Sequence, residues 1–278
     1  MGVKIICVVN DTALHGTNLR SEHGLSICIE TDNGIVLYDT GQTEEVLVQN
    51  FSILNLKPQD ISQIVLSHAH YDHTGGLEAI LRENPECPIF AHNDIFRPRF
   101  SLKNGKYQSI GLSEKLKERL LASNLNLSEK PVQILPDLWT TGEIVARSEP
   151  EGRSANHFIS GKQGWLPDSY RDDLSLVVRS KEKLYVICGC CHAGLLNTLF
   201  HVAQNFNGPI VSVIGGTHLL TADGLYLAHV MDVINEQFTP LEFYLNHCTG
   251  VHAYQIMEKT FGERVRLFPA GTVIDFDG

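Results

Sequence analysis

Short runs of apolar residues, separated by polar turns, divide the first third of the chain into strands and helices. Continuous or alternating apolar positions bounded by turn residues indicate β-strands, whereas apolar positions at helical spacing indicate helices. The turn Asp32-Asn33-Gly34 joins two of these runs as a hairpin. The pattern predicts strands over 4–9, 25–31, 34–39, 61–66 and 88–91, and helices over 43–54 and 77–83.

The last hundred residues repeat one unit: a strand, a turn of small residues that contains a histidine, and a helix. The turns start at Gly189, Gly215 and His247, and the histidines of the first two are His192 and His218. The pattern predicts strands over 183–188, 209–214 and 241–246, each followed by a helix that reaches about 205, 238 and 261.

The strand expected over 61–66 also ends in histidines, at 68–73, and Gly75 and Gly76 follow them. We expect the two glycines to let the backbone turn sharply beneath this cluster. Parallel strands place their C-terminal ends along one edge of a sheet. We therefore expect the histidines at all these strand ends to meet in space, namely those at 68–73, 192, 218 and 247.

Two polar segments interrupt the apolar pattern. Residues 97–131 carry lysine and arginine side chains and are interpreted as a surface insertion. Residues 148–172 are rich in glycine, serine, proline, asparagine and aspartate. A loop of this length is often a functional lid, so we expect it to line an active site. Trp165 and Tyr170 within it are expected to contact and cover the substrate.

Composition narrows the class of protein. The 278 residues are 43% hydrophobic, which suffices for one large core, so we expect a single domain over 1–278. No apolar run reaches the roughly 18 residues of a membrane span, and a net charge of −10 disfavours nucleic acid. The odd count of seven cysteines and the strand-like N-terminus predict a reduced, cytoplasmic protein. We expect a small-molecule substrate and no membrane or nucleic-acid partner; the oligomeric state is not indicated.

The segment His68–His73 places three imidazoles and a carboxylate within six residues. Burying these groups together without a cation would leave polar atoms short of partners. His68 and His70 can face one cation, and Asp72 and His73 can face a second. Two divalent ions can share a bridging hydroxide, and a single zinc ion can also activate water alone. The sequence therefore predicts one or two divalent metal ions, with zinc first and iron or manganese as alternatives.

The same segment, His-x-His-x-Asp-His, resembles the signature of the metallo-β-lactamase superfamily. Tyr38–Gly41 resembles the Asp-Thr-Gly strand end of that superfamily, and His247 stands where its final metal-binding histidine is expected. The resemblance covers essentially the whole chain. It implies an α/β (α+β) fold of the four-layer αββα sandwich type, two face-to-face sheets with helices outside and metals at one edge.

Four further segments resemble one branch of this superfamily. The branch includes the archaeal 7,8-dihydropterin-6-methyl-4-(β-D-ribofuranosyl)aminobenzene 5′-phosphate synthase and bacterial proteins labelled only as metal-dependent hydrolases. The resemblance does not establish that every member of the branch runs the same reaction, so it does not assign one to this chain. The segments are Glu22–Ser26, Gly189–Thr198, Gly215–Leu219 and His247–Gly250.

Two positions depart from the superfamily pattern. A third histidine for the first metal usually comes from mid-chain, yet residues 138–144 contain none. A bridging aspartate usually follows a strand, yet the comparable strand here ends in Gly189–His192. We expect His192 to replace the missing histidine, and Cys190 or Cys191 to replace the bridging carboxylate. The alternatives are that the cysteines only pack, or that the second metal is weak or absent; a thiolate ligand would favour zinc or iron.

Other polar residues are expected around the metal. His23 and His218 are expected to contact the substrate, although a plain turn would equally explain His23. Asp39 is expected to orient the metal-binding loop rather than bind the ion. His192 has a second candidate role, contact with the substrate at the start of the following helix. The expected metal ligands are His68, His70, Asp72, His73, His192 and His247.

The leading hypothesis is a metal-dependent hydrolase that acts on a small, anionic or heterocyclic substrate through a metal-bound hydroxide. Asp72 and His192 are the expected catalytic residues, with Asp72 orienting the hydroxide or accepting its proton. The branch resemblance implies a first alternative, a transferase that joins a pterin methyl-diphosphate to an aromatic amine and releases pyrophosphate. A second alternative is a redox or metal-sensing protein that uses Cys190 and Cys191.

Overall fold

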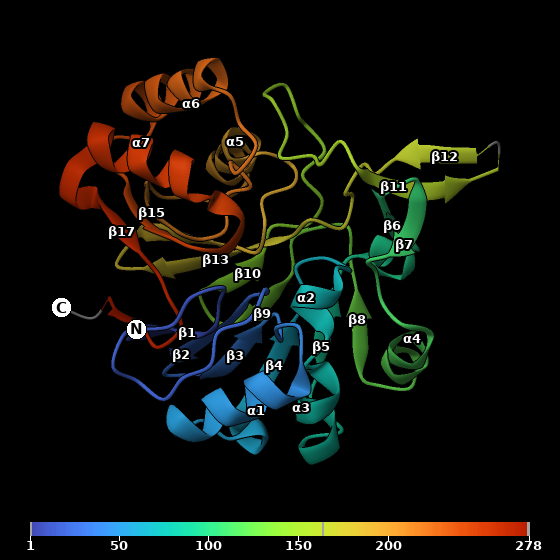
Figure 1. Ribbon diagram of the computed structural model, residues 1–278. Coiled ribbons are helices and arrows are strands. Elements are labelled where there is room, and N and C mark those ends of the chain that lie inside the picture. Colours follow the sequence, from blue (N-terminus) through green and yellow to red (C-terminus); the bar gives the residue numbers. More distant parts are fainter. Residues whose placement is uncertain (1, 163, 277–278) are drawn as a thin grey trace.

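Two seven-stranded sheets lie face to face, with helices on the outer side of each, in the computed structural model (Figure 1). The structure describes residues 2–162 and 164–276. Apolar side chains from both sheets fill the layer between them, for example Ile27 from the first sheet and Leu176 and Ile187 from the second. The predicted four-layer αββα sandwich is therefore confirmed.

The first sheet is antiparallel in its first half and parallel from its fourth strand onward. This change of direction brings the strand that precedes the histidine cluster next to the strand that precedes Asp39. The order is β18 (Val273–Asp275), β1 (Val3–Val9), β2 (Ser26–Thr31), β3 (Gly34–Tyr38), β4 (Ile61–Val65), β5 (Ile89–Ala91) and β8 (Leu125–Leu127).

The second sheet has four neighbouring parallel strands and an antiparallel remainder. The parallel part holds the three strands whose ends carry histidine turns, as predicted. The order is β17 (Val265–Leu267), β16 (Glu242–Leu245), β15 (Ile210–Gly215), β14 (Lys183–Cys188), β13 (Ser175–Ser180), β10 (Leu138–Thr140) and β9 (Gln133–Leu135).

Helices cover the outer faces of the two sheets (Figure 1). The first sheet packs on α1 (Glu44–Ile53), α3 (Leu77–Glu83) and α4 (Glu114–Leu121), and the second on α5 (Leu195–Asn205), α6 (Gly224–Gln237) and α7 (Val251–Phe261). Among the described residues, no helix is long and apolar enough to cross a membrane. Short turns complete the chain: α2 (Tyr71–Thr74), η1 (Pro58–Asp60), η2 (Asn93–Phe96), η3 (His247–Thr249) and η4 (Gly262–Arg264).

A small sheet projects from the body of the molecule (Figure 1). Its order is β12 (Gly164–Pro167), β11 (His157–Gly161), β6 (Arg99–Lys103) and β7 (Lys106–Ser109). The segment 148–172, expected to be a loop, thus contains two strands, and 97–131 supplies the other two. Part of 97–131 lies deeper than a surface insertion would, because β8 pairs with β5 and Leu120 is buried in the core of the first sheet.

Candidate metal centre

The strand β4 delivers the histidine cluster to the interface of the two sheets. It ends at Val65, and His70 is the residue that precedes the single turn α2. The side chains of the cluster are almost inaccessible to solvent: His68 and His73 are buried completely, and His70 and Asp72 expose 5% and 6% of their surface. Buried polar groups at this density need partners, which an ion can supply.

Gly75 and Gly76 form the turn between α2 and α3, as predicted, and they also permit close packing. Their φ angles are −67° and −83°, which any residue adopts. A Cβ atom on Gly75 would lie 1.9 Å from the carbonyl oxygen of Gln42, and one on Gly76 would lie 2.2 Å from that of Thr40. The glycines therefore let α2 pack directly on the loop that follows β3, and this loop carries Asp39.

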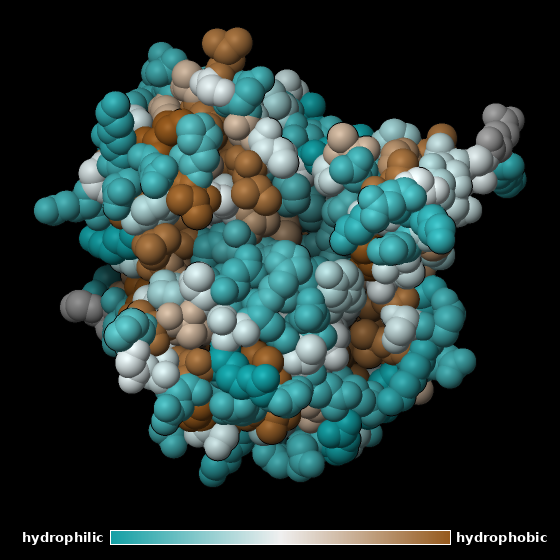
Figure 2. Space-filling model, in the orientation of Figure 1, coloured by the Kyte–Doolittle hydropathy of each residue, from teal (hydrophilic) through white to brown (hydrophobic). Residues whose placement is uncertain are grey.

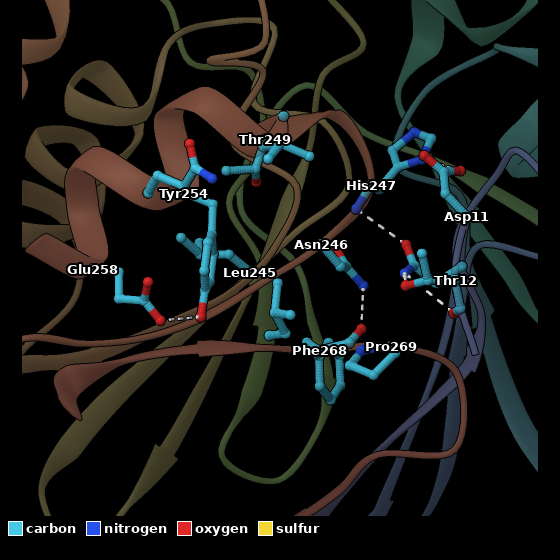
Figure 3. A pocket seen from close by; sticks show the side chains of 15 residues that line it. Asp11, Thr12, Leu245, Asn246, His247, Thr249, Tyr254, Glu258, Phe268 and Pro269 are labelled. Atoms are coloured by element: carbon cyan, nitrogen blue, oxygen red, sulfur yellow. Dashed lines mark hydrogen bonds and ion pairs between the residues drawn. The ribbon is translucent and has the colours of Figure 1, made fainter. Parts of the chain in front are cut away.

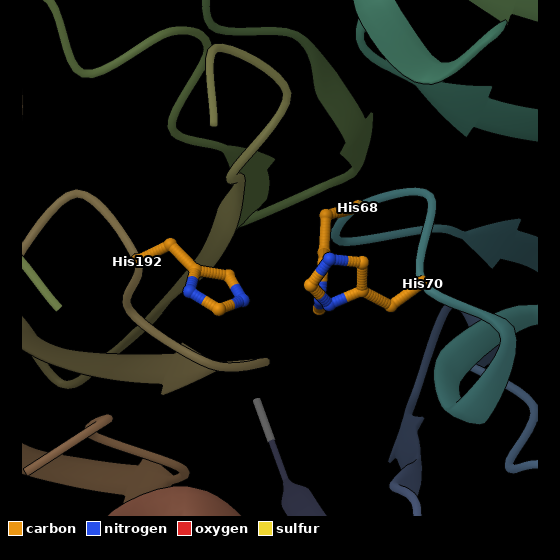
Figure 4. Close-up of side chains that lie close together, drawn as sticks. All are labelled: His68, His70 and His192. Carbon is orange, nitrogen blue, oxygen red and sulfur yellow. The ribbon is translucent and has the colours of Figure 1, made fainter. Parts of the chain in front are cut away.

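Three imidazoles form the first group of donor atoms (Figure 4). His68 Nε2 lies 3.0 Å from His70 Nδ1, and His192 reaches them from the turn after β14. His192 Nδ1 donates to the carbonyl oxygen of Gly152 at 3.0 Å, so the lone pair is on its Nε2 atom. Among the described residues, this Nε2 atom has no hydrogen-bond partner. The three rings point toward one another, as expected of ligands of one cation.

Asp72, His73 and His247 form the second group of donors. His73 Nε2 lies 3.3 Å from His247 Nε2 and 3.7 Å from Asp72 Oδ2, and His247 Nε2 lies 3.6 Å from the same carboxylate oxygen. Donors around a tetrahedral ion with bonds of 2.0–2.2 Å are about 3.3–3.6 Å apart. The residues present therefore fit a divalent cation, and the sequence-predicted ligands from both sheets meet as expected.

The two cysteines at the end of β14 have different surroundings. Cys190 Sγ lies 3.3 Å from His73 Nε2, and Cys190 forms a further possible metal group with His68 and His73. It therefore lies between the two groups of donors, where the superfamily pattern has its bridging carboxylate. Cys191 instead packs in the core beneath the second sheet, next to residues such as Leu195 and Leu219. Position thus favours Cys190 over Cys191 as the ligand.

Buried carboxylates hold the loops of the centre in place. Asp39 accepts hydrogen bonds from the backbone nitrogen of Ser67 at 2.7 Å and from His73 Nδ1 at 2.7 Å, so it orients the loop as expected. Asp172 accepts from the backbone nitrogen of Ala69 at 2.9 Å. Asp173, the next residue, accepts from that of Ala193 at 2.8 Å. Adjacent carboxylates therefore hold the histidine loops of the two sheets.

Asp172 also forms a buried ion pair that sequence reasoning missed. The side chain of Arg99, from β6, is completely buried and lies 2.5 Å from Asp172 Oδ1 and 3.0 Å from Asp168 Oδ2. Burial raises the pKa of Asp172 to about 7, and the Arg99 guanidinium opposes this shift. The pair connects the small sheet to the histidine loop, a connection that no sequence motif indicates.

The backbone is strained at several positions around the centre. Asp39, Cys191, His218 and His247 have φ angles of 59°, 57°, 48° and 46°. Residues other than glycine are uncommon in this left-handed region, and such residues cluster at functional sites. All four follow strand ends, so the strain lies where the loops converge on the donor atoms.

Further histidines surround the donor atoms. His23 Nε2 lies 3.3 Å from Asp72 Oδ2, and its Nδ1 lies 3.3 Å from Asp11 Oδ1. The ring of His157 lies 5.2 Å from that of His70, and the ring of His218 lies 4.3 Å from that of His192. His23 and His218 are thus placed beside the predicted ligands. The sequence could not place His157 and did not identify Asp11.

The two aromatic residues expected to contact the substrate lie in different places. Tyr170 is buried and stacks on His192, with ring centroids 3.9 Å apart. Trp165 stacks on Tyr107 at 3.7 Å in the projecting small sheet, and it is 40% exposed. In the described part of the chain, none of the ring contacts of Trp165 involves a histidine of the centre. The structure therefore brings Tyr170, and not Trp165, to the metal ligands.

Burial sets the protonation of most of the histidines. It is the main cause that lowers the pKa of His68, His70 and His192 well below the usual value, so their imidazoles are neutral near pH 7. Burial also lowers the pKa of His73, but the carboxylates of Asp39 and Asp72 outweigh it and raise the pKa overall. Neutral imidazoles have the free lone pair that a metal ligand needs.

A cavity of about 420 Å³ adjoins the centre (Figure 3). Asp11 and His247 lie on one side of it, and Tyr254 and Glu258 lie on the other. Phe268 also lines it. Figure 2 shows a largely hydrophilic surface at the middle of this face, with apolar side chains next to it on the side of α6 and α7. The surroundings of the centre thus offer both polar and apolar contacts.

Comparison with known proteins agrees with this geometry. The family model of the metallo-beta-lactamase superfamily matches residues 21–157. The chain is 31% identical to the 7,8-dihydropterin-6-methyl-4-(beta-D-ribofuranosyl)-aminobenzene-5′-phosphate synthase of Methanocaldococcus jannaschii, over 99% of this chain and 97% of that protein.

Solved structures give the same result. A crystal structure described as Tm1679, a metal-dependent hydrolase of the beta-lactamase superfamily, is 26% identical and has a TM-score of 0.83 over 98% of each chain. Zinc-bound PqqB from Methylobacterium extorquens has a TM-score of 0.59 at 12% identity and covers 99% of this chain and 100% of its own. At this low identity, the likeness to PqqB shows a shared fold alone.

Proposed function

The chain belongs to the metallo-beta-lactamase superfamily, and we propose that it is a metal-dependent hydrolase of a small anionic substrate that carries a flat, partly apolar group. One observation carries the proposal: six donor side chains from two sheets converge on either side of Cys190. Structural packing alone does not require so many buried donors with lone pairs in one place.

The two groups of donors assign positions to the ions. His68, His70 and His192 would hold one divalent cation. Asp72, His73 and His247, whose donor atoms lie 3.3–3.7 Å apart, would hold a second. Bound cations of this kind supply Lewis-acid chemistry and lower the pKa of water to near neutrality. The protein contributes the positions of the donors and a buried site.

Asp72 and His23 are suited to move the proton that hydrolysis releases. Asp72 is positioned to accept it at its carboxylate, and His23 Nε2 lies 3.3 Å from Asp72 Oδ2. The hydrogen bond from His23 to Asp11 raises the pKa of His23, which favours its protonated form. The side chain of His23 is 60% exposed, so it can pass a proton to solvent.

Charge and shape indicate the class of substrate. Two divalent cations held by one carboxylate and one thiolate leave a positive centre, which attracts anions. His218 Nδ1 is buried beside His192 and finds no hydrogen-bond partner within 2–162 and 164–276, so it is suited to contact a polar substrate atom. The adjoining cavity, with Tyr254 and Phe268 in its lining, accommodates a flat group.

Metal content and hydrolysis test the proposal together. The purified protein is assayed by elemental analysis and against a panel of phosphate esters, phosphodiesters and lactones. We expect bound divalent metal and metal-dependent release of product from at least one anionic member with an aromatic group. A protein that purifies and remains without metal after reconstitution would contradict the proposal.

A transferase is the second candidate, and full-length similarity favours it. The named synthase is 31% identical over nearly the whole of both chains. In this reaction an aromatic carbon or nitrogen nucleophile would replace the pyrophosphate of a pterin methyl-diphosphate. Pyrophosphate release that requires the aromatic amine would support the transferase, whereas release by water alone would support the hydrolase.

A further inference from the structure

We propose that Cys248 is a second thiolate ligand, which acts with Cys190 and gives the second metal position a strong preference for soft ions. This inference rests on the proposed metal-dependent function and adds a ligand to that site. The donor atoms of Cys190, Cys248 and His247 all lie within 4.8 Å of one another. They therefore extend the group formed by Asp72 and His73 with His247.

The local structure places the Cys248 sulfur toward the centre. Cys248 follows His247 directly in η3, and its Sγ lies 3.5 Å from the carbonyl oxygen of Cys190. Gly216 provides the space, because a Cβ atom there would lie 2.6 Å from Cys248 Sγ. The fold thus brings the turns after β14, β15 and β16 together around this sulfur.

A backbone donor also points at the same sulfur. The backbone nitrogen of His218 donates to Cys248 Sγ at 3.3 Å, and the left-handed φ of 48° at His218 helps to set this direction. Hydrogen bonds to a negatively charged acceptor are stronger than those to a neutral one. Two neighbouring thiolates, Cys190 buried and Cys248 half-buried, would repel each other, and a cation between them and His247 would offset this repulsion.

The added thiolate changes which metals the site accepts. Carboxylate and imidazole donors alone suit manganese as well as zinc, whereas thiolates select zinc, iron and other soft ions. With Cys190 and Cys248 both bound, the second position should hold zinc, cobalt or cadmium much more tightly than manganese. The first position, which consists of imidazoles, should show a weaker preference.

Cobalt spectroscopy tests the inference on the full-length protein. The apoprotein is loaded with Co(II), and the near-ultraviolet thiolate-to-cobalt absorption is measured per bound ion. Cys190→Ser and Cys248→Ser are each expected to remove a substantial part of this band, and the double variant should lack it. Cys87→Ser is the matched control, because Cys87 is also buried but lies in the core of the first sheet, where its thiol donates to the carbonyl oxygen of Ile61.

The outcomes separate this inference from the proposed function. A band that Cys248→Ser leaves unchanged would overturn the role of Cys248, even if Cys190→Ser abolishes it. Bound cobalt without any thiolate band would overturn the inference and leave the metal enzyme intact, whereas failure to bind metal would contradict both. As a second readout, Cys248→Ser should lower the affinity for cadmium by at least about tenfold and change that for manganese little.

Discussion

The two sheets contribute to the metal centre in different ways. The first sheet supplies four donors from one loop, His68–His73, which are close together because they are close in the sequence. The second sheet supplies its candidate donors from two turns, at 190–192 and at 247, which the parallel strands bring together. One half of the centre therefore depends on local spacing and the other half on topology.

Two adjacent aspartates, Asp172 and Asp173, connect the loops of the two sheets. Asp172 holds the first sheet's loop through the backbone of Ala69, and Asp173 holds the second sheet's turn through that of Ala193. Two adjacent residues thus fix the relative position of donors that belong to different sheets. Substitutions in the His68–His73 loop, in the turns of the second sheet and at these two aspartates should therefore affect metal binding to different degrees.

Substitution of the histidines in the His68–His73 loop should have the largest effect on metal binding and activity. The double substitution His68→Ala and His70→Ala removes two of the three donors of the first group. It also changes the loop that carries Asp72 and His73, two donors of the second group. We expect loss of bound metal and a fall of hydrolysis to the uncatalysed background, measured by elemental analysis and substrate turnover. Full metal content in the folded double variant would exclude this loop as the metal site.

Removal of one donor from the second half should have a more selective effect. His247→Ala should empty the second position and leave the first filled, so metal content should fall by roughly half for a two-ion centre. Isothermal titration with zinc measures the number of sites. His252→Ala is the control, because His252 is exposed on α7 a few residues away. Equal loss of zinc from both positions would show that the two positions do not bind metal independently.

Substitution of the connecting carboxylates Asp172 and Asp173 should have a smaller effect on metal binding. Asp172→Asn should weaken the first position through the His68–His73 loop, and Asp173→Asn should weaken it through the turn that carries His192. Each loss should be roughly 10- to 100-fold, as seen when residues that support metal ligands are replaced. Metal affinities of the folded variants give the comparison, and Asp137→Asn, at a surface ion pair with Arg179, serves as the control. Unchanged metal affinity in both folded variants would argue against a positioning role for these two carboxylates.

The last expected effect concerns the pH dependence of stability in the metal-free protein rather than metal binding. His68, His70 and His192 are neutral when folded, because their pKa values are lowered, but the unfolded chain protonates them below about pH 6.5. Unfolding thus takes up protons, and the free energy of unfolding should fall as the pH drops from about 7.5 to 5.5, by up to about 1.4 kcal/mol per pH unit for each group. His73, whose pKa is raised, offsets part of this loss.

Chemical denaturation across this pH range measures the effect. His192→Gln should show a shallower dependence than the parent protein, because one of the three neutral imidazoles is gone. A parent protein whose stability rises on acidification through this range would contradict the assignment of neutral, buried imidazoles.

The sequence predicted the parts of the centre that follow from spacing and strand order. The cluster His68–His73 is local, and the turns at His192 and His247 follow from the rule that parallel strands end on one edge. The four-layer fold likewise follows from the alternation of strands and helices together with the superfamily motif. The fold is confirmed and these residues lie together because few residues and one geometric rule determine both, whereas their role as metal ligands stays a prediction.

Contacts between distant segments were not predictable in the same way. The burial of Arg99 depends on a small sheet built from two separate segments, and the hairpin within it was expected to be a loop. Asp11 reaches the centre only because the end of β1 lies beside the turn after β16. Cys248 stood next to a predicted ligand, yet its direction depends on the space left by Gly216.

The central claim is that the second sheet completes a two-ion centre around Cys190, and a crystal structure of the zinc-loaded protein tests it most directly. Anomalous scattering at the zinc edge should show one ion among His68, His70 and His192 and a second among Asp72, His73 and His247. Cys190 Sγ should lie about 2.3 Å from zinc, the length of a zinc–thiolate bond. A single ion bound only by the His68–His73 loop, with Cys190 beyond bonding distance, would contradict the account.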